Sequence, residues 1–519
     1  MEIVNFTSPK AKIPEDSLKK RYLYKLGTNL IGLAVGLVTE SIIPRGLGPA
    51  AYGNFNFLSN FFTQVINFFD AGTSTAFYTK LSQRPTDVGL LRFYWGFTEL
   101  LGLTVCLGVG ITFSLGLESW LWPEQTTLFI WLAVLWGLLA WYSERINHIV
   151  DAYGLTVKSE IARIWQKILG LVLILLMFWA DRFSLTEFFI YQYVILLFLC
   201  VAWWWLLTQS GKALFPKIQL TFQQIKNYGQ EFYHYSAPLV TFTFFSLFVG
   251  ILDRWLLQRF AGSVEQGFFG LSFKIGAICF LFTRAMTPLL LREFSMAFER
   301  QDLNQMRYLF QRYIPLLYVV AAFFAVFVAV QAEKVSLIFG GSEFRGASLA
   351  IGIMAFYPIH QTYGQLSSSV LFATGQTKLY RNIGLFMLLI NLPLTLWLLG
   401  PKEWSGLNLG ATGLAVEMVL IQFIGVNGQL WFNTRFLQLS FWKLIGHQIY
   451  SVALLVGVAW LSVTFIDQMI NSTLLGFLVG GFIYTLGVGL VLFLLPSLVF
   501  MSRADLIRQL AQLRLIRSL

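Results

Sequence analysis

The chain has 519 residues, of which 56% are apolar and 17% aromatic, whereas only 12% are charged. Soluble domains carry roughly 25% charged residues, and no globule of this size has enough interior to hide so much apolar surface. A soluble enzyme is therefore excluded and a membrane protein is predicted. The 37 Lys and Arg exceed the 26 Asp and Glu, an excess that we assign to cytoplasmic loops facing anionic lipid and not to nucleic-acid binding.

Apolar stretches long enough to cross a bilayer recur along the chain. A helix needs about 20 such residues to span the hydrocarbon core, and fourteen stretches reach this length. They cover approximately residues 24–43, 51–78, 92–117, 126–147, 160–180, 184–208, 234–258, 266–291, 313–332, 346–372, 379–399, 408–432, 447–466 and 473–498. The sequence therefore predicts an all-α polytopic membrane protein with about fourteen transmembrane helices.

The distribution of basic residues predicts the orientation of these helices, because cytoplasmic loops are enriched in Lys and Arg. With the N-terminus in the cytoplasm, 28 of the 37 basic residues fall in cytoplasmic segments and helix ends, and seven fall in outer ones. The remaining two, Lys274 and Arg284, lie inside a span. We therefore expect a multi-pass protein of a bacterial-type inner (plasma) membrane with both termini in the cytoplasm.

A polar connection between the sixth and seventh spans divides the chain. We expect a cytoplasmic N-terminal segment, a first lobe of six helices, a cytoplasmic linker, a second lobe of six helices, a further helix pair and an amphipathic cytoplasmic tail. These parts cover residues 1–23, 24–208, 209–232, 233–435, 436–501 and 502–519. In the tail, leucines at helical spacing are interspersed with arginines, a pattern typical of helices that lie on a membrane surface.

Two connections on the outer side share a pattern at an offset of 214 residues. The first span is followed by Arg45, Gly48 and Gly53, and the seventh by Arg259, Gly262 and Gly267. Their placement at the same point of two six-helix halves predicts a parallel repeat with a pseudo-two-fold axis along the membrane normal. Glycine at such a turn permits a tight reversal and a close approach of helices.

These turns also resemble those of a known family. The stretch RGLGPAAYG at 45–53 leads into a long second span that ends in Asp70-Ala-Gly-Thr, and further similar turns occur at 339–344, 371–378 and 406–413. Over most of residues 20–435 the sequence is similar to the polysaccharide transporter branch (O-antigen and exopolysaccharide flippases) of the MOP superfamily, which also includes lipid II flippases and MATE drug exporters. The resemblance implies two six-helix lobes in a MATE-like V around a central cavity, with the last two helices as an added pair.

Charges inside the membrane are costly and therefore mark candidate functional positions. The basic candidates, which we expect to hold an anionic diphosphate in the cavity, are Arg254, Lys274 and Arg284. A guanidinium suits phosphate oxygens through its fork of donors. The candidates for carrying a coupling proton or sodium ion are Glu40, Asp70, Glu99, Asp253 and Glu417. At the 214-residue offset, Glu40 is the counterpart of Arg254 and Asp70 of Arg284, so one lobe presents acids where the other presents bases.

The alternative interpretation is that these charges pair and neutralise one another. Adjacent residues point to different faces of a helix, so Asp253 and Arg254 cannot form a simple neighbour pair. Residues near the inner helix ends, from which long side chains reach the interface, are interpreted as candidate anchors; they include Arg145, Arg163, Lys167 and Arg292.

Catalytic and metal-binding motifs are missing from the sequence. The three cysteines lack the spacing of a metal site, so no metal or cofactor is predicted beyond the coupling ion. P-loop, HExxH and GxSxG patterns do not occur, and the outer loops are too short for the large catalytic loop of an O-antigen polymerase. We therefore do not expect an enzyme.

The resemblance implies a flippase that moves a polyprenyl-diphosphate-linked oligosaccharide from the cytoplasmic to the outer leaflet by alternating access. Its expected partners are this lipid-linked oligosaccharide, membrane lipids and glycan polymerase or assembly proteins, without nucleic acid. The alternatives are a lipid II flippase, a MATE-like exporter of cations, and a non-transporting scaffold for glycan assembly. The deep basic residues of the second lobe count against the exporter, and intramembrane charges of both signs count against the scaffold.

Overall fold

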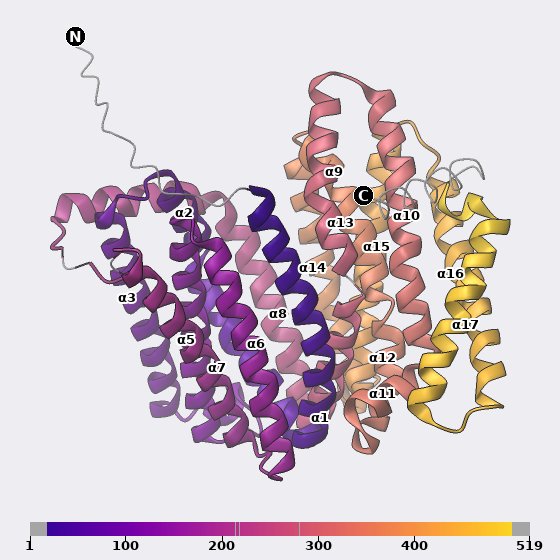
Figure 1. Cartoon of the computed structure of the whole chain (residues 1–519), viewed down its shortest axis with the longest axis horizontal. Coiled ribbons are helices and arrows are strands. Elements are labelled where there is room, and N and C mark those ends of the chain that lie inside the picture. Colours follow the sequence, from indigo (N-terminus) through magenta and orange to yellow (C-terminus); the bar gives the residue numbers. More distant parts are fainter. Residues whose placement is uncertain (1–17, 213, 217, 280, 501–519) are drawn as a thin grey trace. The chain divides into compact units, whose positions relative to one another are not determined.

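The computed structural model describes residues 18–500 apart from residues 213, 217 and 280. The predicted amphipathic tail and most of the predicted N-terminal segment lie outside the described residues. Throughout the described part of the chain, the regular elements are helices (Figure 1). Their starts follow local capping: Asp87, Ser184 and Asp302 each accept a hydrogen bond from a backbone N–H in the first turn of the helix that follows.

The α-helices follow one another along the described chain. From the N-terminal side they are α1 (Leu18–Asp70), α2 (Thr73–Gln83), α3 (Val88–Ser114), α4 (Glu118–Leu121), α5 (Thr127–Ala152), α6 (Thr156–Trp179), α7 (Leu185–Gln209) and α8 (Phe222–Ile278). They continue with α9 (Leu281–Glu299), α10 (Leu303–Val330), α11 (Ala332–Gly340), α12 (Ser348–Met354), α13 (Tyr357–Ala373), α14 (Thr377–Leu399), α15 (Gly410–Phe436), α16 (Phe441–Asp467) and α17 (Thr473–Leu494).

Each of the fourteen predicted spans has a helical counterpart. Within the described residues, nine unbroken helices are long and apolar enough to cross a membrane: α3, α5, α6, α7, α10, α14, α15, α16 and α17. The other five spans are the two halves of α1, the first half of α8, the second half of α8 with α9, and α12 with α13. The all-α polytopic fold predicted from the sequence is therefore confirmed.

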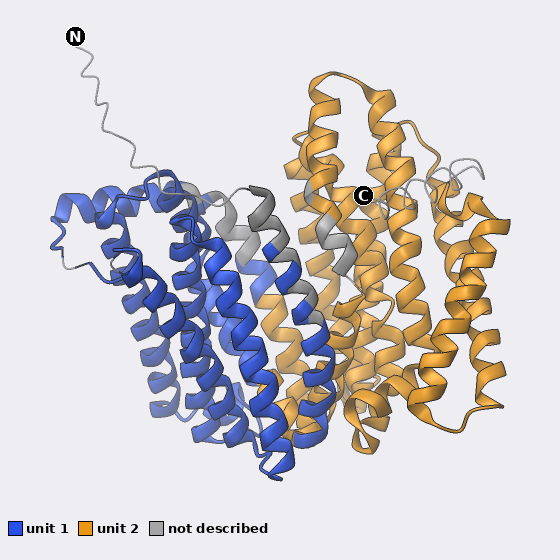
Figure 2. Cartoon of the chain, viewed as in Figure 1, with its two compact units in different colours: residues 1–46, 58–247 blue, residues 47–57, 248–519 orange. Residues whose placement is uncertain are grey.

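Two compact units make up the chain (Figure 2). The first unit comprises residues up to 46 and 58–247, and the second comprises 47–57 and 248 onward. All three points at which the chain changes unit fall inside long helices: α1 enters the second unit for a short stretch and leaves it again, and α8 passes from the first unit into the second. Each unit has its own apolar core: the rings of Phe77 and Tyr94 stack at 4.0 Å in the first, and Tyr318 packs edge-on against Tyr363 in the second.

The two glycines of the predicted repeat break the two long helices. Gly48 interrupts α1 with φ 70° and ψ 168°, and Gly262 interrupts α8 with φ 81° and ψ −177°. Side chains rarely tolerate this positive φ, whereas glycine adopts it readily. The same unusual conformation at the same repeat position therefore supports the predicted duplication. The segments that follow the breaks also meet within the second unit, where the Ser263 hydroxyl donates to Asn54 Oδ1.

The beginning of α8 is anchored to the first unit by a polar cluster. Arg84 donates two hydrogen bonds to the carboxylate of Glu231, at 2.8 and 2.9 Å, and Lys80 Nζ lies 2.9 Å from the same group. Tyr228 donates to Asp87 at 2.8 Å. Partial burial by itself would raise the pKa of Glu231, but the hydrogen bonds from Arg84 and Lys80 outweigh it and hold this pKa below its usual range.

Candidate functional site

Two of the predicted acidic candidates meet in the second unit, where one side chain bridges them. Asn391 of α14 donates through Nδ2 to Oε1 of Glu417 on α15, and its Nδ2 lies 3.5 Å from Oδ2 of Asp253 on α8. The other Asp253 oxygen accepts from the Thr395 hydroxyl at 3.2 Å. Three helices thus bring two carboxyl groups, an amide and a hydroxyl to one point inside the membrane-spanning bundle.

This carboxyl cluster, which comprises Asp253, Asn391, Thr395 and Glu417, is removed from solvent and rich in oxygen. Glu417 is fully buried and Asn391 is 6% exposed. Glu417 Oε2 and Asn391 Oδ1 are buried and have no hydrogen-bond partner among the described residues. Buried acceptors without a donor are costly. The cluster therefore has the composition that accommodates a proton or a small hard cation, since such cations prefer oxygen ligands.

Arg254, the residue after Asp253, points to a different face of α8, as expected from its position. Its guanidinium carbon lies 4.2 Å from the ring centre of Phe269 and 5.6 Å from that of Phe273, on the part of α8 beyond the break at Gly262. Its Nη1 is buried without a hydrogen-bond partner among the described residues. The aromatic faces stabilise the cation and leave donor capacity for another group.

Lys274 lies farther along α8 than Phe273. Its Nζ is 5.2 Å from the ring centre of Tyr52, on the segment of α1 that belongs to the second unit. Tyr52 is fully buried, so the lysine makes a cation–π contact with a ring inside the unit. All three basic candidates belong to the second unit. The third, Arg284, lies on α9, and its side chain is outside the described residues.

The remaining acidic candidates belong to the first unit. Glu40 lies on the first half of α1 and is half-buried. Glu99 lies on an exposed face of α3 with 61% of its side chain accessible, and Arg92 Nη1 is 3.9 Å from its carboxylate. Glu40 and Glu99 therefore belong to a different unit from the carboxyl cluster.

Asp70 ends α1 and caps the helix that follows. One carboxylate oxygen accepts from Thr73 Oγ1 at 2.9 Å and from the Ser74 backbone N–H at 3.2 Å, and the other accepts from Ser74 Oγ at 2.7 Å. Arg145 Nη1 lies 3.9 Å away, and the two charged side chains are only 5% and 8% exposed. The interpretation of Arg145 as a snorkelling anchor is therefore wrong, because its side chain pairs with Asp70 inside the unit.

Sequence reasoning missed Asn391 and Thr395. Both lie in the apolar part of α14, spaced four residues apart and therefore on one face. A polar pair of this kind in a membrane helix predicts a face that packs against neighbouring helices. The sequence does not indicate which residues this face contacts, because Asp253 and Glu417 are distant along the chain and become its neighbours only through helix packing.

Comparison with known proteins identifies the fold. No family model matches the chain, and no curated protein sequence matches it. The lipid II flippase MurJ, in an inward closed conformation, superposes with a TM-score of 0.65 at 14% identity, covering 91% of this chain and 99% of MurJ. The inward-facing form of a MATE multidrug resistance transporter gives 0.57 at 13% identity, covering 82% and 98%. A MOP superfamily transporter from Pyrococcus furiosus gives 0.52 at 14% identity, covering 81% and 96%.

The fold is that of the MOP superfamily transporters. Each of these structures is matched over nearly its whole length, so the likeness extends to the complete architecture. A shared fold at this identity does not specify a substrate, which has to be argued from the site.

Proposed function

We propose that the protein is a flippase that moves a polyprenyl-diphosphate-linked oligosaccharide from the cytoplasmic to the outer leaflet, driven by a coupling ion. The observation that carries the proposal is Arg254. It is a guanidinium within the membrane-spanning bundle, seated on Phe269, with Nη1 buried and unpartnered among the described residues. A charge at this depth is costly. An anionic ligand provides the missing acceptor and offsets that cost.

The diphosphate suits this position for electrostatic reasons. Arg254 and Lys274 both lie on α8 against aromatic rings, and a guanidinium binds phosphate oxygens through paired donors. Arg284 would be the third contact. Because the lipid-linked substrate must also leave, a small set of cations is preferable to a dense one, in which release would be slow.

The carboxyl cluster would bind the coupling ion. Two carboxyl groups that share one amide donor repel each other when both are charged, and a proton or a sodium ion relieves that repulsion. Asp253 and Arg254 are adjacent, so loading the cluster changes the charge next to the proposed diphosphate contact. In this arrangement the ion and the substrate would act on the same helix through neighbouring residues. Glu40, Asp70 and Glu99 remain further candidates for the same role.

The decisive measurement is the pool of polyprenyl-linked glycans in cells that lack the protein, with the leaflet assigned by the accessibility of the glycan. We expect a completed oligosaccharide to accumulate on the cytoplasmic leaflet and to clear when the intact protein is restored. Arg254→Ala should fail to clear it. The matched control is Arg182→Ala, at an exposed position in the α6–α7 connection. If the glycan pool is unchanged and drug tolerance is altered, the flippase proposal is wrong and the protein is better described as a MATE-like exporter.

A lipid II flippase is the second candidate. The likeness to MurJ covers 91% of the chain, whereas the likeness to the MATE transporter covers 82%, so more of the fourteen-helix architecture has a counterpart in MurJ. The same measurement separates the two candidates, because accumulation of lipid II in place of an oligosaccharide precursor would assign the protein to peptidoglycan synthesis.

A further inference from the structure

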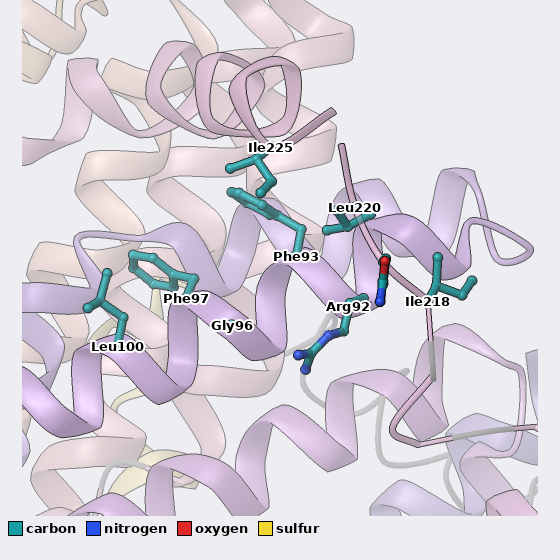
Figure 3. A pocket seen from close by; sticks show the side chains of 9 residues that line it. Arg92, Phe93, Gly96, Phe97, Leu100, Ile218, Leu220 and Ile225 are labelled. Atoms are coloured by element: carbon teal, nitrogen blue, oxygen red, sulfur yellow. The ribbon is translucent and has the colours of Figure 1, made fainter. Parts of the chain in front are cut away.

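A groove of about 580 Å³ opens in the first unit between the beginning of α3 and the segment that leads into α8 (Figure 3). The α3 side of the groove includes Arg92, Phe93, Gly96 and Phe97, and the opposite side includes Ile218, Leu220 and Ile225. One wall is therefore a membrane helix and the other is the linker. The lining is apolar except for Arg92 and Gln219.

The linker wall is held against α3 by specific contacts. Trp95 Nε1 donates to the Leu214 carbonyl oxygen at 2.8 Å, and its ring lies 4.8 Å from that of Phe215. The rings of Phe93 and Tyr228 lie 5.4 Å apart. Because these contacts involve several points along the linker, the groove is a fixed feature of the first unit.

Arg92 provides a positive charge at one end of the groove. Its ion pair with Glu99 has a separation of 3.9 Å, beyond hydrogen-bond distance, and both side chains are well exposed. Exposed pairs of this kind contribute little, so the guanidinium keeps donors for another acceptor. In the predicted topology, this end of α3 is at the cytoplasmic surface of the membrane, where lipid phosphates lie.

The other end of the groove continues into a surface that faces hydrocarbon. Leu100 lines the groove and is 62% exposed, and it is followed along the same face of α3 by exposed Leu103, Leu107 and Ile111. In the first turn of α8, Phe222 is 82% exposed and Ile225 is 44% exposed. Large apolar side chains exposed next to a basic residue are typical of a segment that lies in the membrane interface.

We propose that this groove binds one anionic glycerophospholipid of the cytoplasmic leaflet, with its phosphate at Arg92 and an acyl chain along Gly96 and Leu100. The charge of Arg92 and the apolar stripe from Leu100 onward match the two parts of such a lipid, whose phosphate would compete with the Glu99 carboxylate for Arg92. The bound lipid would fill the space between α3 and the linker and hold the beginning of α8 in place. This proposal does not depend on the transported substrate.

Gly96 allows a sharp test. A Cβ at Gly96 meets no atom within 4 Å, and the same holds for Gly108 farther along α3. Gly96→Leu should place its side chain in the groove, and Gly108→Leu is the matched control. We would titrate the purified full-length protein with dioleoyl-phosphatidylglycerol and count bound lipids by native mass spectrometry. The affinity for the most tightly bound lipid should be at least about tenfold lower in Gly96→Leu and unchanged in Gly108→Leu. Equal binding by both variants would overturn the proposal.

Arg92→Gln tests the headgroup contact, with exposed Arg300→Gln at the α9–α10 connection as its control. Only Arg92→Gln should lower the affinity for phosphatidylglycerol, and by several-fold. A second titration with undecaprenyl phosphate separates the two sources of a phosphate on an apolar chain. If that lipid occupies the Gly96-sensitive site and phosphatidylglycerol does not, the phospholipid proposal is wrong and the groove belongs to the lipid-linked substrate.

Discussion

Gly53 and Gly267, which are counterparts at the 214-residue offset, each pack against the backbone of the other's segment within the second unit. A Cβ added at Gly53 would overlap the carbonyl oxygen of Ser263, and one added at Gly267 would overlap that of Pro49. Pro49 and Ser263 are themselves counterparts at the same offset. The two contacts are therefore equivalent under exchange of the repeats, as expected for a pseudo-two-fold axis that passes between them.

This reciprocity predicts that alanine is destabilising at both glycines. Gly53→Ala and Gly267→Ala should each lower the free energy of unfolding by about 1–3 kcal/mol, the usual cost of overpacking, because backbone cannot move aside as a flexible side chain can. The measurement is the thermal unfolding temperature of the purified protein. Gly36→Ala in α1 is the control, because a Cβ there meets nothing within 4 Å; if all three variants melt alike, the close approach is not structurally important.

The carboxyl cluster predicts separate effects on coupling and on folding. Glu417→Gln and Asp253→Asn remove a charge with little change in shape, so we expect a folded protein whose ion-driven transport falls by about tenfold or more. Transport by reconstituted protein would be measured against an imposed proton or sodium gradient. Glu403→Gln, at an exposed position in the short 3-10 helix between α14 and α15, should transport normally. Retention of gradient-driven transport in both cluster variants would make the cluster a structural polar network.

The buried pair of Asp70 and Arg145 predicts a large stability effect in the first unit. Arg145→Met removes the cation beside the buried Asp70 carboxylate but leaves its hydrogen bonds from Thr73 and Ser74 in place, so we expect a cost of about 1–3 kcal/mol. Chemical unfolding of the single variants and of Arg145→Met/Asp70→Asn would show partial recovery in the double variant. Arg163→Met is the control, because its side chain is 35% exposed and lies 3.9 Å from Glu160, so less than about 1 kcal/mol is expected. A similar loss in both arginine variants would contradict the assignment.

The sequence was sufficient to predict the helices and the repeat, because both depend on local patterns. Apolar length gives the spans, and a glycine that recurs at a fixed offset gives the breaks at Gly48 and Gly262. The break between α12 and α13 has a weaker sequence signal, which is Pro358 in the first turn of α13. Proline is tolerated in the first turn of a helix but disrupts a helix interior.

The site was less predictable, because depth in the membrane does not reveal which way a side chain faces. Arg145 near a helix end is consistent with an anchor, yet its side chain turns inward to Asp70. Asp253 and Glu417 were predicted singly as deep acids, whereas their meeting at Asn391 depends on how α8, α14 and α15 pack. Sequence therefore supplies the candidates, and the packing of helices decides which of them act together.

The polar cluster at the beginning of α8 predicts how linker docking depends on pH. The pKa of Glu231 is lowered by its hydrogen bonds to Arg84 and Lys80, so its contribution is fully present above the ordinary glutamate pKa of about 4.3 and is lost as the pH falls through the lower folded value. Hydrogen exchange of residues 218–232 should therefore be constant, after correction for the intrinsic rate, from about pH 8 to 5 and should rise below about pH 4. In Glu231→Gln, exchange should be faster at neutral pH and lack this acidic step. An acidic step that persists in Glu231→Gln would assign the pH dependence to another group, with Asp87, which accepts from Tyr228, as the next carboxylate to test.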